Sequence, residues 1–243
     1  MCIMVFSDTT TNLGILQQVR QFMRVDANQW ATSKVVNSVN NYLDTVAGYA
    51  IGADRKFQWD DSNHTKLPIG TTNLVANQSD YSFLSDGQGN RIITLTRIDI
   101  QDSSGNWTQL KPIDQFQVEG GLDEFYETAA QPIYYDKLAD NVIRLYPKPA
   151  TSVTSGLKFY FQRSPSYFTA TDTIKEPGVA NTLHRGFVIS AAYDGALTLG
   201  LKNLPALAVE MEKEQQKMMD YFLNRNNDEK VTIGSRSRGY SFR

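Results

Sequence analysis

Residues 26–52, DANQWATSKVVNSVNNYLDTVAGYAIG, contain the clearest helical pattern in the N-terminal half of the chain. Apolar side chains recur there at three- and four-residue steps, which is the period of a helix with one buried face. Asp26 and Gln29 have the spacing of a capping box, so the pattern predicts a helix that follows Asp26 and runs to about Gly52. Its apolar face consists of Val35, Val36, Val39, Tyr42, Leu43, Val46 and Ala50.

A shorter helix is predicted just before this one, after a cluster of capping residues at positions 9–12. The junction at residues 25–27 is so short that the two helices should fold back as a hairpin, with stripes that face each other or a neighbour. We assign residues 1–56 to this N-terminal helical hairpin. The apolar stripe of the shorter helix consists of Leu13, Leu16, Val19, Phe22 and Met23.

From residue 57 the pattern changes to short runs of Ile, Val, Thr, Tyr and Phe between Gly, Pro, Asn and Asp, which predicts a β-rich insertion over residues 57–168. Alternation changes phase near Thr96 and Arg97, which indicates a β-bulge. A short helix is expected over residues 112–119. The predicted strands are 74–76, 80–84, 91–101 and 107–110, with a hairpin turn at 102–106, then 133–136 paired with 142–146, and a strand in which Leu157, Phe159 and Phe161 share one face.

Helical period returns after residues 176–178, and residues 169–223 are assigned to a C-terminal helical hairpin that packs with the N-terminal helices. Small residues in its first helix suggest close packing against another helix, because glycine in a helix interior costs about 1 kcal/mol relative to alanine. Pro205 suits the first turn of the last helix, which should run to about Leu223. The expected fold class is therefore α+β, a helical bundle with a sandwich- or barrel-like β insertion and an extended C-terminal tail, residues 224–243.

The composition is that of an ordinary globular protein, with 41% hydrophobic and 21% charged residues. Lys and Arg number 24 and Asp and Glu 26, giving a net charge of −2, so no global positive field would gather nucleic acid or an anionic membrane. Cys2 is the only cysteine, which excludes a disulfide within the chain. The apolar start is shorter than a signal core and no window is long enough for a membrane helix, so we expect a soluble protein, and the single cysteine is compatible with a reducing cytoplasm.

Catalytic candidates are few, and none meets a known spacing rule. Residues 59–64, WDDSNH, are best explained as a polar loop. His184 is expected on a helix surface, without a nucleophile elbow near it in sequence. The acids Asp123, Glu124, Glu127 and Asp136 have no constrained spacing for glycoside hydrolysis. The sequence lacks phosphate-binding, dinucleotide-binding and zinc-protease motifs, so we expect no enzyme, catalytic residue, cofactor or metal site.

The last eleven residues combine arginines with aromatic side chains and contain no acid. One interpretation is a frayed terminus. The other, which we favour, is an arm that becomes ordered on a partner, with the aromatic residues as anchors and the arginines pairing with acidic groups or phosphates. The residues of this arm that we expect to contact the partner are Ile233, Arg236, Arg238, Tyr240, Phe242 and Arg243.

The order of helical hairpin, β insertion, helical hairpin and tail resembles the head-to-tail adaptor, or connector, proteins of tailed bacteriophages, over nearly the whole chain. The stretches that carry the resemblance are Val36, Val39, Asn40, Tyr42 and Leu43, then residues 143–149, IRLYPKP, and then Ala191, Ala192, Tyr193, Ala196 and Leu197. The long β insertion departs from the smallest members, which leaves open an adaptor proper or another neck component.

The resemblance implies a structural virion protein of the phage neck, made in the host cytoplasm. Adaptors of this kind form rings, typically of twelve copies, that join the portal protein to the tail and form part of the channel for genomic DNA, without reading its sequence. The arm would dock on the portal, and the β insertion would face outward or toward a downstream tail or nozzle protein. The alternative is a carbohydrate- or surface-binding module of a virion fibre or secreted enzyme, suggested by the Tyr- and Trp-containing hairpins.

Overall fold

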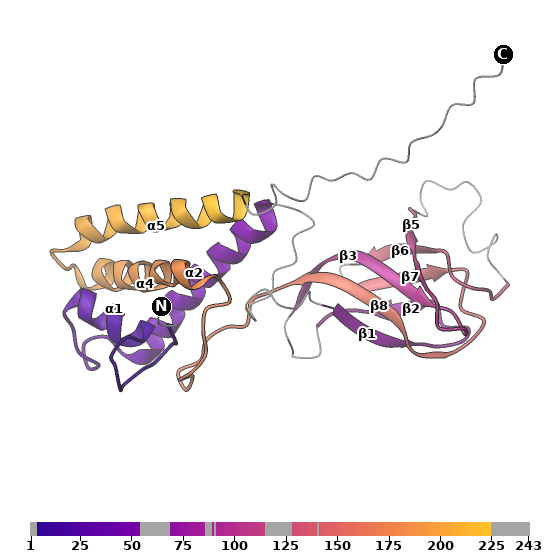
Figure 1. Ribbon diagram of the computed structural model, residues 1–243, viewed down its shortest axis with the longest axis horizontal. Helices are drawn as coiled ribbons and strands as arrows, with labels where there is room; N and C mark the ends of the chain where they lie inside the picture. Colours follow the sequence, from indigo (N-terminus) through magenta and orange to yellow (C-terminus); the bar gives the residue numbers. More distant parts are fainter. Residues whose placement is uncertain are drawn as a thin grey trace, which may run out of the picture.

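The computed structural model describes residues 4–53, 69–85, 89, 91–114, 128–139 and 141–224. A helical body lies at one end of the molecule and a β body at the other (Figure 1). Each body has its own cluster of buried apolar side chains. The predicted α+β class is confirmed, and the predicted sandwich-like character of the insertion fits two four-stranded sheets that share one core.

Within the described residues the helical body contains four α-helices: α1 (Ile15–Met23), α2 (Thr32–Ala53), α4 (His184–Leu199) and α5 (Leu204–Asn224). A single 3-10 turn, η2 (Asn181–Leu183), leads into α4. Both α1 and α2 pack mainly against α4 and touch each other little, and α5 lies along α4 and α2 (Figure 1). The apolar faces of the two N-terminal helices therefore meet a neighbour, one of the two arrangements that the sequence left open.

Glycines allow the other helices to approach α4 closely. A β-carbon on Gly186 would lie 2.8 Å from the hydroxyl oxygen of Tyr42 in α2, and one on Gly195 would overlap the end of the Met23 side chain from α1. Tyr42 also makes an edge-to-face contact with Phe187, with ring centroids 5.0 Å apart. The predicted close packing of this small-residue helix is thus confirmed, and α2 and α1 are its partners.

The predicted start and stripe of the first helix are partly wrong. Ile15, Leu16, Val19 and Met23 are buried, whereas Leu13 is 48% and Phe22 39% exposed. The residue before α1 is Gly14, which offers no side-chain cap. The N–H groups of Ile15 and Leu16 instead donate to the carbonyls of Val5 and Phe6, so the N-terminal segment satisfies donors that a helix start leaves unpaired.

The capping box predicted at Asp26 and Gln29 forms, but it does not begin the long helix. The Asp26 N–H donates to the Gln29 side chain and the Gln29 N–H donates to the Asp26 carboxylate. These bonds close a separate turn in which the Trp30 N–H donates to the Asp26 carbonyl. The helix then starts at Thr32 and ends at Ala53, close to its predicted end.

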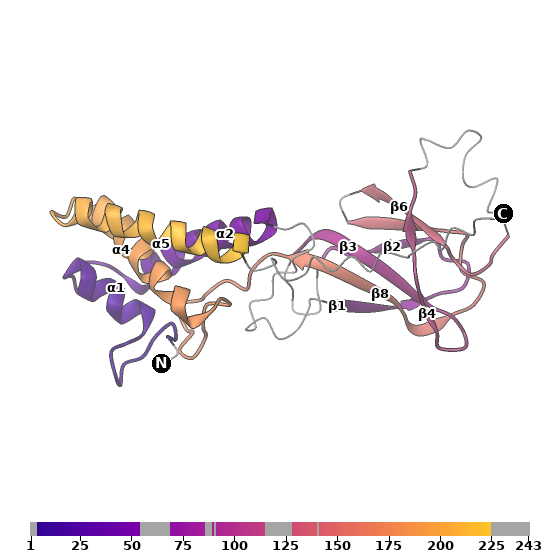
Figure 2. The ribbon, with the colours of Figure 1, turned by 45° about the horizontal axis from the view of Figure 1, so that its top comes forward.

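One sheet of the β body has the strand order β1-β8-β3-β4 and the other the order β2-β7-β6-β5. Figure 2 shows the strands of both sheets within the β body. The two sheets share one core, in which Ile98, Phe159 and Ile143 are buried. The strands are β1 (Ile69–Leu74), β2 (Asp80–Ser82), β3 (Ile92–Gln101), β4 (Trp107–Gln109), β5 (Lys111–Pro112), β6 (Tyr134–Ala139), β7 (Val142–Tyr146) and β8 (Val153–Arg163).

Several strand predictions are confirmed and two are wrong. The β3–β4 hairpin, the β6–β7 pairing and the shared buried face of Leu157, Phe159 and Phe161 are all present. The pairing register of β3 with β8 shifts between Leu95 and Arg97, where the bulge was predicted. The first strand ends at Leu74 instead of beginning there. Pro112, expected to start a helix, lies in β5, and residues 115–119 of that prediction lie outside the described residues.

The chain returns from the β body through residues 164–168, which are attached to the middle of α2. The Asn40 side chain donates to the Phe168 carbonyl at 3.0 Å and accepts from the Phe168 N–H at 2.8 Å. The Tyr167 hydroxyl donates to the Asp44 carboxylate at 2.6 Å. Phe168 itself is buried in the helical core, stacked on Phe6. The end of the insertion is therefore fixed to α2 by side chains that are part of the helical body.

Candidate functional site

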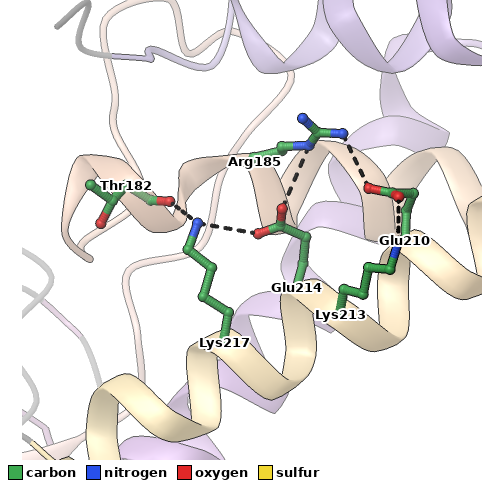
Figure 3. A network of polar contacts seen from close by, with 6 residues as sticks. All are labelled: Thr182, Arg185, Glu210, Lys213, Glu214 and Lys217. Atoms are coloured by element: carbon green, nitrogen blue, oxygen red, sulfur yellow. Dashed lines mark hydrogen bonds and ion pairs between the residues drawn. The ribbon is translucent and has the colours of Figure 1, made fainter.

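Five charged side chains join α5 to the beginning of α4 (Figure 3). The Arg185 guanidinium in α4 lies 3.2 Å from the carboxylate of Glu210 and 3.5 Å from that of Glu214, both in α5. Glu210 and Glu214 are also paired with Lys213 and Lys217, each three residues further along α5. This network fixes the position of α5 along α4.

The network is largely exposed at its rim and buried at its centre. Lys213 holds the pKa of Glu210 below its usual range, with a smaller contribution from Arg185. Glu214 is only 13% exposed, and one of its carboxylate oxygens is buried without a hydrogen bond, 3.7 Å from the Lys217 ammonium. Lys217 also donates to the Thr182 carbonyl at 2.7 Å, which extends the network to η2. Exposed ion pairs contribute little individually to stability. Glu214 is the one member of the network that is largely buried, so we expect it to matter most for the stability of the helical body.

An apolar groove of about 190 Å³ lies between the C-terminal parts of α2 and α5. We call it the α2/α5 groove. Its walls are Gly48, Tyr49 and Gly52 from α2 and Met219 and Leu223 from α5. Leu223 is 59% exposed, and a β-carbon on either glycine would meet no atom within 4 Å. The groove is therefore an open surface whose floor is bare helix backbone.

The predicted arm begins beside this groove, because α5 ends at Asn224, next to Leu223. Its predicted contact residues Ile233, Arg236, Arg238, Tyr240, Phe242 and Arg243 lie outside the described residues. Their role as a docking site therefore stays a prediction.

The outer face of the sheet that contains β8 pairs cations with aromatic rings. The Lys158 ammonium lies 3.9 Å from the centroid of the Trp107 ring, and the Arg97 guanidinium lies 5.4 Å from that of Tyr160. Arg97 also donates to Asp99 at 2.6 Å. One face of the Trp107 ring is thus occupied by a side chain of the same protein.

The expectation that His184 lies on a helix surface is wrong. Its side chain is fully buried at the start of α4, with Nε2 3.0 Å from the Val179 carbonyl oxygen. Burial lowers the pKa of His184 below its usual value. The error has a physical cause, since α4 is surrounded by α1, α2 and α5 and has little outer face to expose.

The other catalytic candidates gain no support from the described part of the chain. Residues 59–64 and the acids Asp123, Glu124 and Glu127 lie outside it, and Asp136 lies in β6. Within the described ranges there is no group of three or more His, Cys, Asp or Glu side chains placed to hold a metal ion. None of the helices described there is both long and apolar enough to cross a membrane.

In the comparison with protein families, residues 10–237 match the model of the SU10 adaptor protein family. The chain belongs to the SU10 adaptor protein family. The match spans both bodies and extends into the predicted arm. No curated protein sequence matches the chain. Family membership supports a phage structural adaptor, a virion component, and argues for a non-enzymatic role.

Sequence reasoning missed the ion network and the groove for different reasons. Glu210, Lys213, Glu214 and Lys217 were recognisable as charged neighbours on one helix, but their pairing with Arg185 depends on how α5 lies against α4. The groove had a signal in the sequence, because Gly48 and Gly52 stand four residues apart on one side of the predicted helix.

Proposed function

We propose that this protein is the head-to-tail adaptor of a tailed phage, assembled as a ring, typically of twelve copies, between the portal protein and the tail. The observation that carries the proposal is the family match, which covers residues 10–237 and so includes the helical body, the β body and part of the arm. A structural role also agrees with a helical body whose polar network serves to hold helices together.

The charge of the chain suits a channel through which DNA passes without being held. A protein that binds DNA by its backbone neutralises phosphates with many Lys and Arg residues and becomes strongly salt-dependent. This chain has a net charge of −2. A ring of such subunits would not retain the genome by a general electrostatic attraction, which favours passage during ejection.

We assign the two ends of the subunit to two partners. The arm, with Ile233, Arg236, Arg238, Tyr240, Phe242 and Arg243, is the proposed contact with the portal, because Arg and aromatic residues are enriched among those that dominate binding energy. The β body, which has a core of its own, is the proposed contact with the downstream tail or nozzle protein.

Purified full-length protein mixed with the portal protein of the same phage tests the proposal. Native mass spectrometry and electron microscopy should show a ring of this protein on the portal. The free protein can be a monomer before assembly, so the portal must be present. A protein that stays monomeric and unattached beside an intact portal would contradict the proposal.

The alternative of a carbohydrate-binding module gains no support from the Trp107 hairpin. Sugar rings bind by stacking on exposed aromatic faces, and Lys158 occupies one face of Trp107. Modules of that class are also commonly all-β, whereas the described part of this chain both begins and ends in a helical body. Binding to defined glycans on an array would reopen this alternative.

A further inference from the structure

At the end of the helical body that lies away from the β body, α1 and α4 end and α2 and α5 begin (Figures 1 and 2). We call this end the helical tip. The Asn203 side chain donates to the Phe22 carbonyl at 2.9 Å, so the turn between α4 and α5 lies against the end of α1. These segments belong to two described ranges without gaps, 4–53 and 141–224, apart from the side chain of residue 53.

The helices α1 and α4 end in the same backbone motif with different residues. Arg24 follows α1 with φ 57° and ψ 44°, and Gly200 follows α4 with φ 63° and ψ 38°. In both motifs the N–H of the next residue donates back to a helix carbonyl, at 3.1 Å after Arg24 and 2.9 Å after Gly200. Glycine is the usual residue in this motif, because the left-handed region costs other residues conformational energy. Arg24 therefore occupies a position that glycine would fill with less strain.

The helix that Arg24 terminates does not explain its side chain. A cation is favoured at a helix C-terminus, but Arg20 already lies in the last turn of α1, where it donates to the Trp30 carbonyl and the Thr32 hydroxyl. Two helices end and two begin at the helical tip, so their dipoles largely offset one another. Arg24 is exposed, and within the described residues its guanidinium makes no ion pair. Strained residues of this kind are concentrated at functional sites.

The helical tip is basic, although the chain as a whole has a net charge of −2. Residues 20–34 and 196–209 contain four basic residues and a single acid, Asp26. The Asp26 carboxylate accepts two N–H groups of its own turn, and the next acid along α5 belongs to the ion network. Arg24 and Lys202 are therefore without an acidic partner in the described part of the chain.

Two large apolar side chains are exposed beside these cations. Phe22 is 39% exposed in the last turn of α1, and Leu199, the last residue of α4, is 38% exposed. Leu199 follows Gly195 by one turn, so it lies on the face of α4 that meets α1, where Gly195 approaches Met23. The resulting surface, which we call the tip patch, consists of Phe22, Arg24, Leu199 and Lys202.

We propose that the tip patch binds an acidic surface of the portal protein. Its unpaired cations select an acidic partner by charge complementarity. The exposed Phe22 and Leu199 select a protein over DNA, because contacts to the DNA backbone are polar, whereas the centre of a protein interface is apolar. The portal follows from the proposed function, on which the inference rests. The β body is assigned there to the downstream tail protein, and the helical tip lies at the opposite end of the molecule (Figure 1).

The arm is long enough to contact the same partner, although it begins at the other end of α5. Helix α5 has 21 residues and is therefore about 32 Å long. The residues after Asn224, which run to Arg243, can span up to about 65 Å when fully extended. The arm and the tip patch can thus be two separate contacts on the portal.

Attachment of the full-length protein to the portal protein of the same phage, measured by co-sedimentation over a range of concentrations, tests the inference. Arg24→Gly should weaken attachment about tenfold, while the unfolding temperature of the free protein stays the same or rises. A residue needed only for folding would lower the unfolding temperature instead. Lys202→Glu should also weaken attachment about tenfold or more. The matched control is Lys137→Glu, at an exposed position in β6, which should attach like the wild type.

The salt dependence of attachment separates the charged contact from the apolar one. Attachment of the wild type should weaken as salt is raised, and Lys202→Glu should flatten this dependence, because it removes an attraction to acidic groups. Phe22→Ser should weaken attachment and leave the salt dependence unchanged. An unchanged salt dependence in Lys202→Glu would contradict an acidic partner.

The other outcomes show which proposal fails. If the wild type attaches to the portal and both Arg24→Gly and Lys202→Glu attach equally well, the inference fails alone. If the wild type stays unattached beside an intact portal, the proposed function fails. Two further assays use a short DNA duplex and native mass spectrometry of the free protein. If the two variants lose binding to the duplex, or self-association, but keep portal attachment, the tip patch binds DNA or a second copy and the inference is overturned.

Discussion

Glu214 of α5 meets Arg185 of α4 across the helix interface, with Oε1 3.5 Å from the guanidinium Nε, and it is the most buried acid of the ion network. Arg185 is about half exposed, so the ion pair joins a largely buried carboxylate to an accessible guanidinium. Removing the guanidinium would leave this carboxylate with Lys217 as its remaining charged partner in the network.

The first prediction follows from this asymmetry. Arg185→Ala should lower the free energy of unfolding by about 1–2 kcal/mol, because a buried charged group loses a partner. Lys213→Ala removes a rim charge and should have a smaller effect. Urea unfolding followed by circular dichroism compares the two, and equal losses would show that the burial of Glu214 is unimportant.

The second prediction contrasts two helical glycines. Gly186→Ala should destabilise the helical body by about 1–2 kcal/mol, since the new methyl group would crowd the buried Tyr42 ring. Gly48→Ala should stabilise it by up to about 1 kcal/mol, because the methyl group meets open space and alanine favours a helix. Thermal unfolding of the two variants should move in opposite directions, and a shift of both in one direction would refute the packing argument.

The third prediction concerns the dependence of stability on pH. Burial lowers the pKa of His184, so the unfolded chain binds the proton more readily than the folded chain does. Stability should be fully present above the unfolded pKa, about 6.5, and should fall as the pH drops below it. Urea unfolding between pH 7.5 and 5.5 measures the slope. His184→Gln should flatten it, whereas His64→Gln should leave it unchanged if His184 is its source.

The fourth prediction concerns the arm. Deletion of residues 228–243 should leave the unfolding temperature of the free protein unchanged, because the described cores end with Phe222. The same deletion should strongly reduce attachment to the portal, measured by co-sedimentation. A marked loss of thermal stability would show that these residues belong to the core and would overturn their assignment as an arm.

The sequence predicted those elements whose pattern depends on local periodicity. The end of α2 and the bulge of β3 were visible because an uninterrupted apolar period and a change of phase are properties of neighbouring residues. The start of α2 was misplaced because the Asp26 and Gln29 box is equally able to close an isolated turn. Strand β1 was missed because Leu74 is the only buried residue among its six, which leaves no apolar alternation to detect.

The candidate site was harder to predict because it depends on contacts between elements. His184 was assigned to a surface since a single helix does not show how many neighbours surround it. Arg185 could not be connected to Glu214 before the register of α4 and α5 was known.

The two hydrogen bonds between Asn40 and Phe168 have a mechanical consequence. A force on the β body that is transmitted along residues 164–168 acts on Asn40, near the middle of α2. It is therefore applied within the helical body and not at one of its ends. The two bonds run side by side between the same pair of residues, and they share the force in parallel instead of breaking one after the other. Tension that arrives along residues 164–168 would therefore be borne at α2 before it reached η2 and α4.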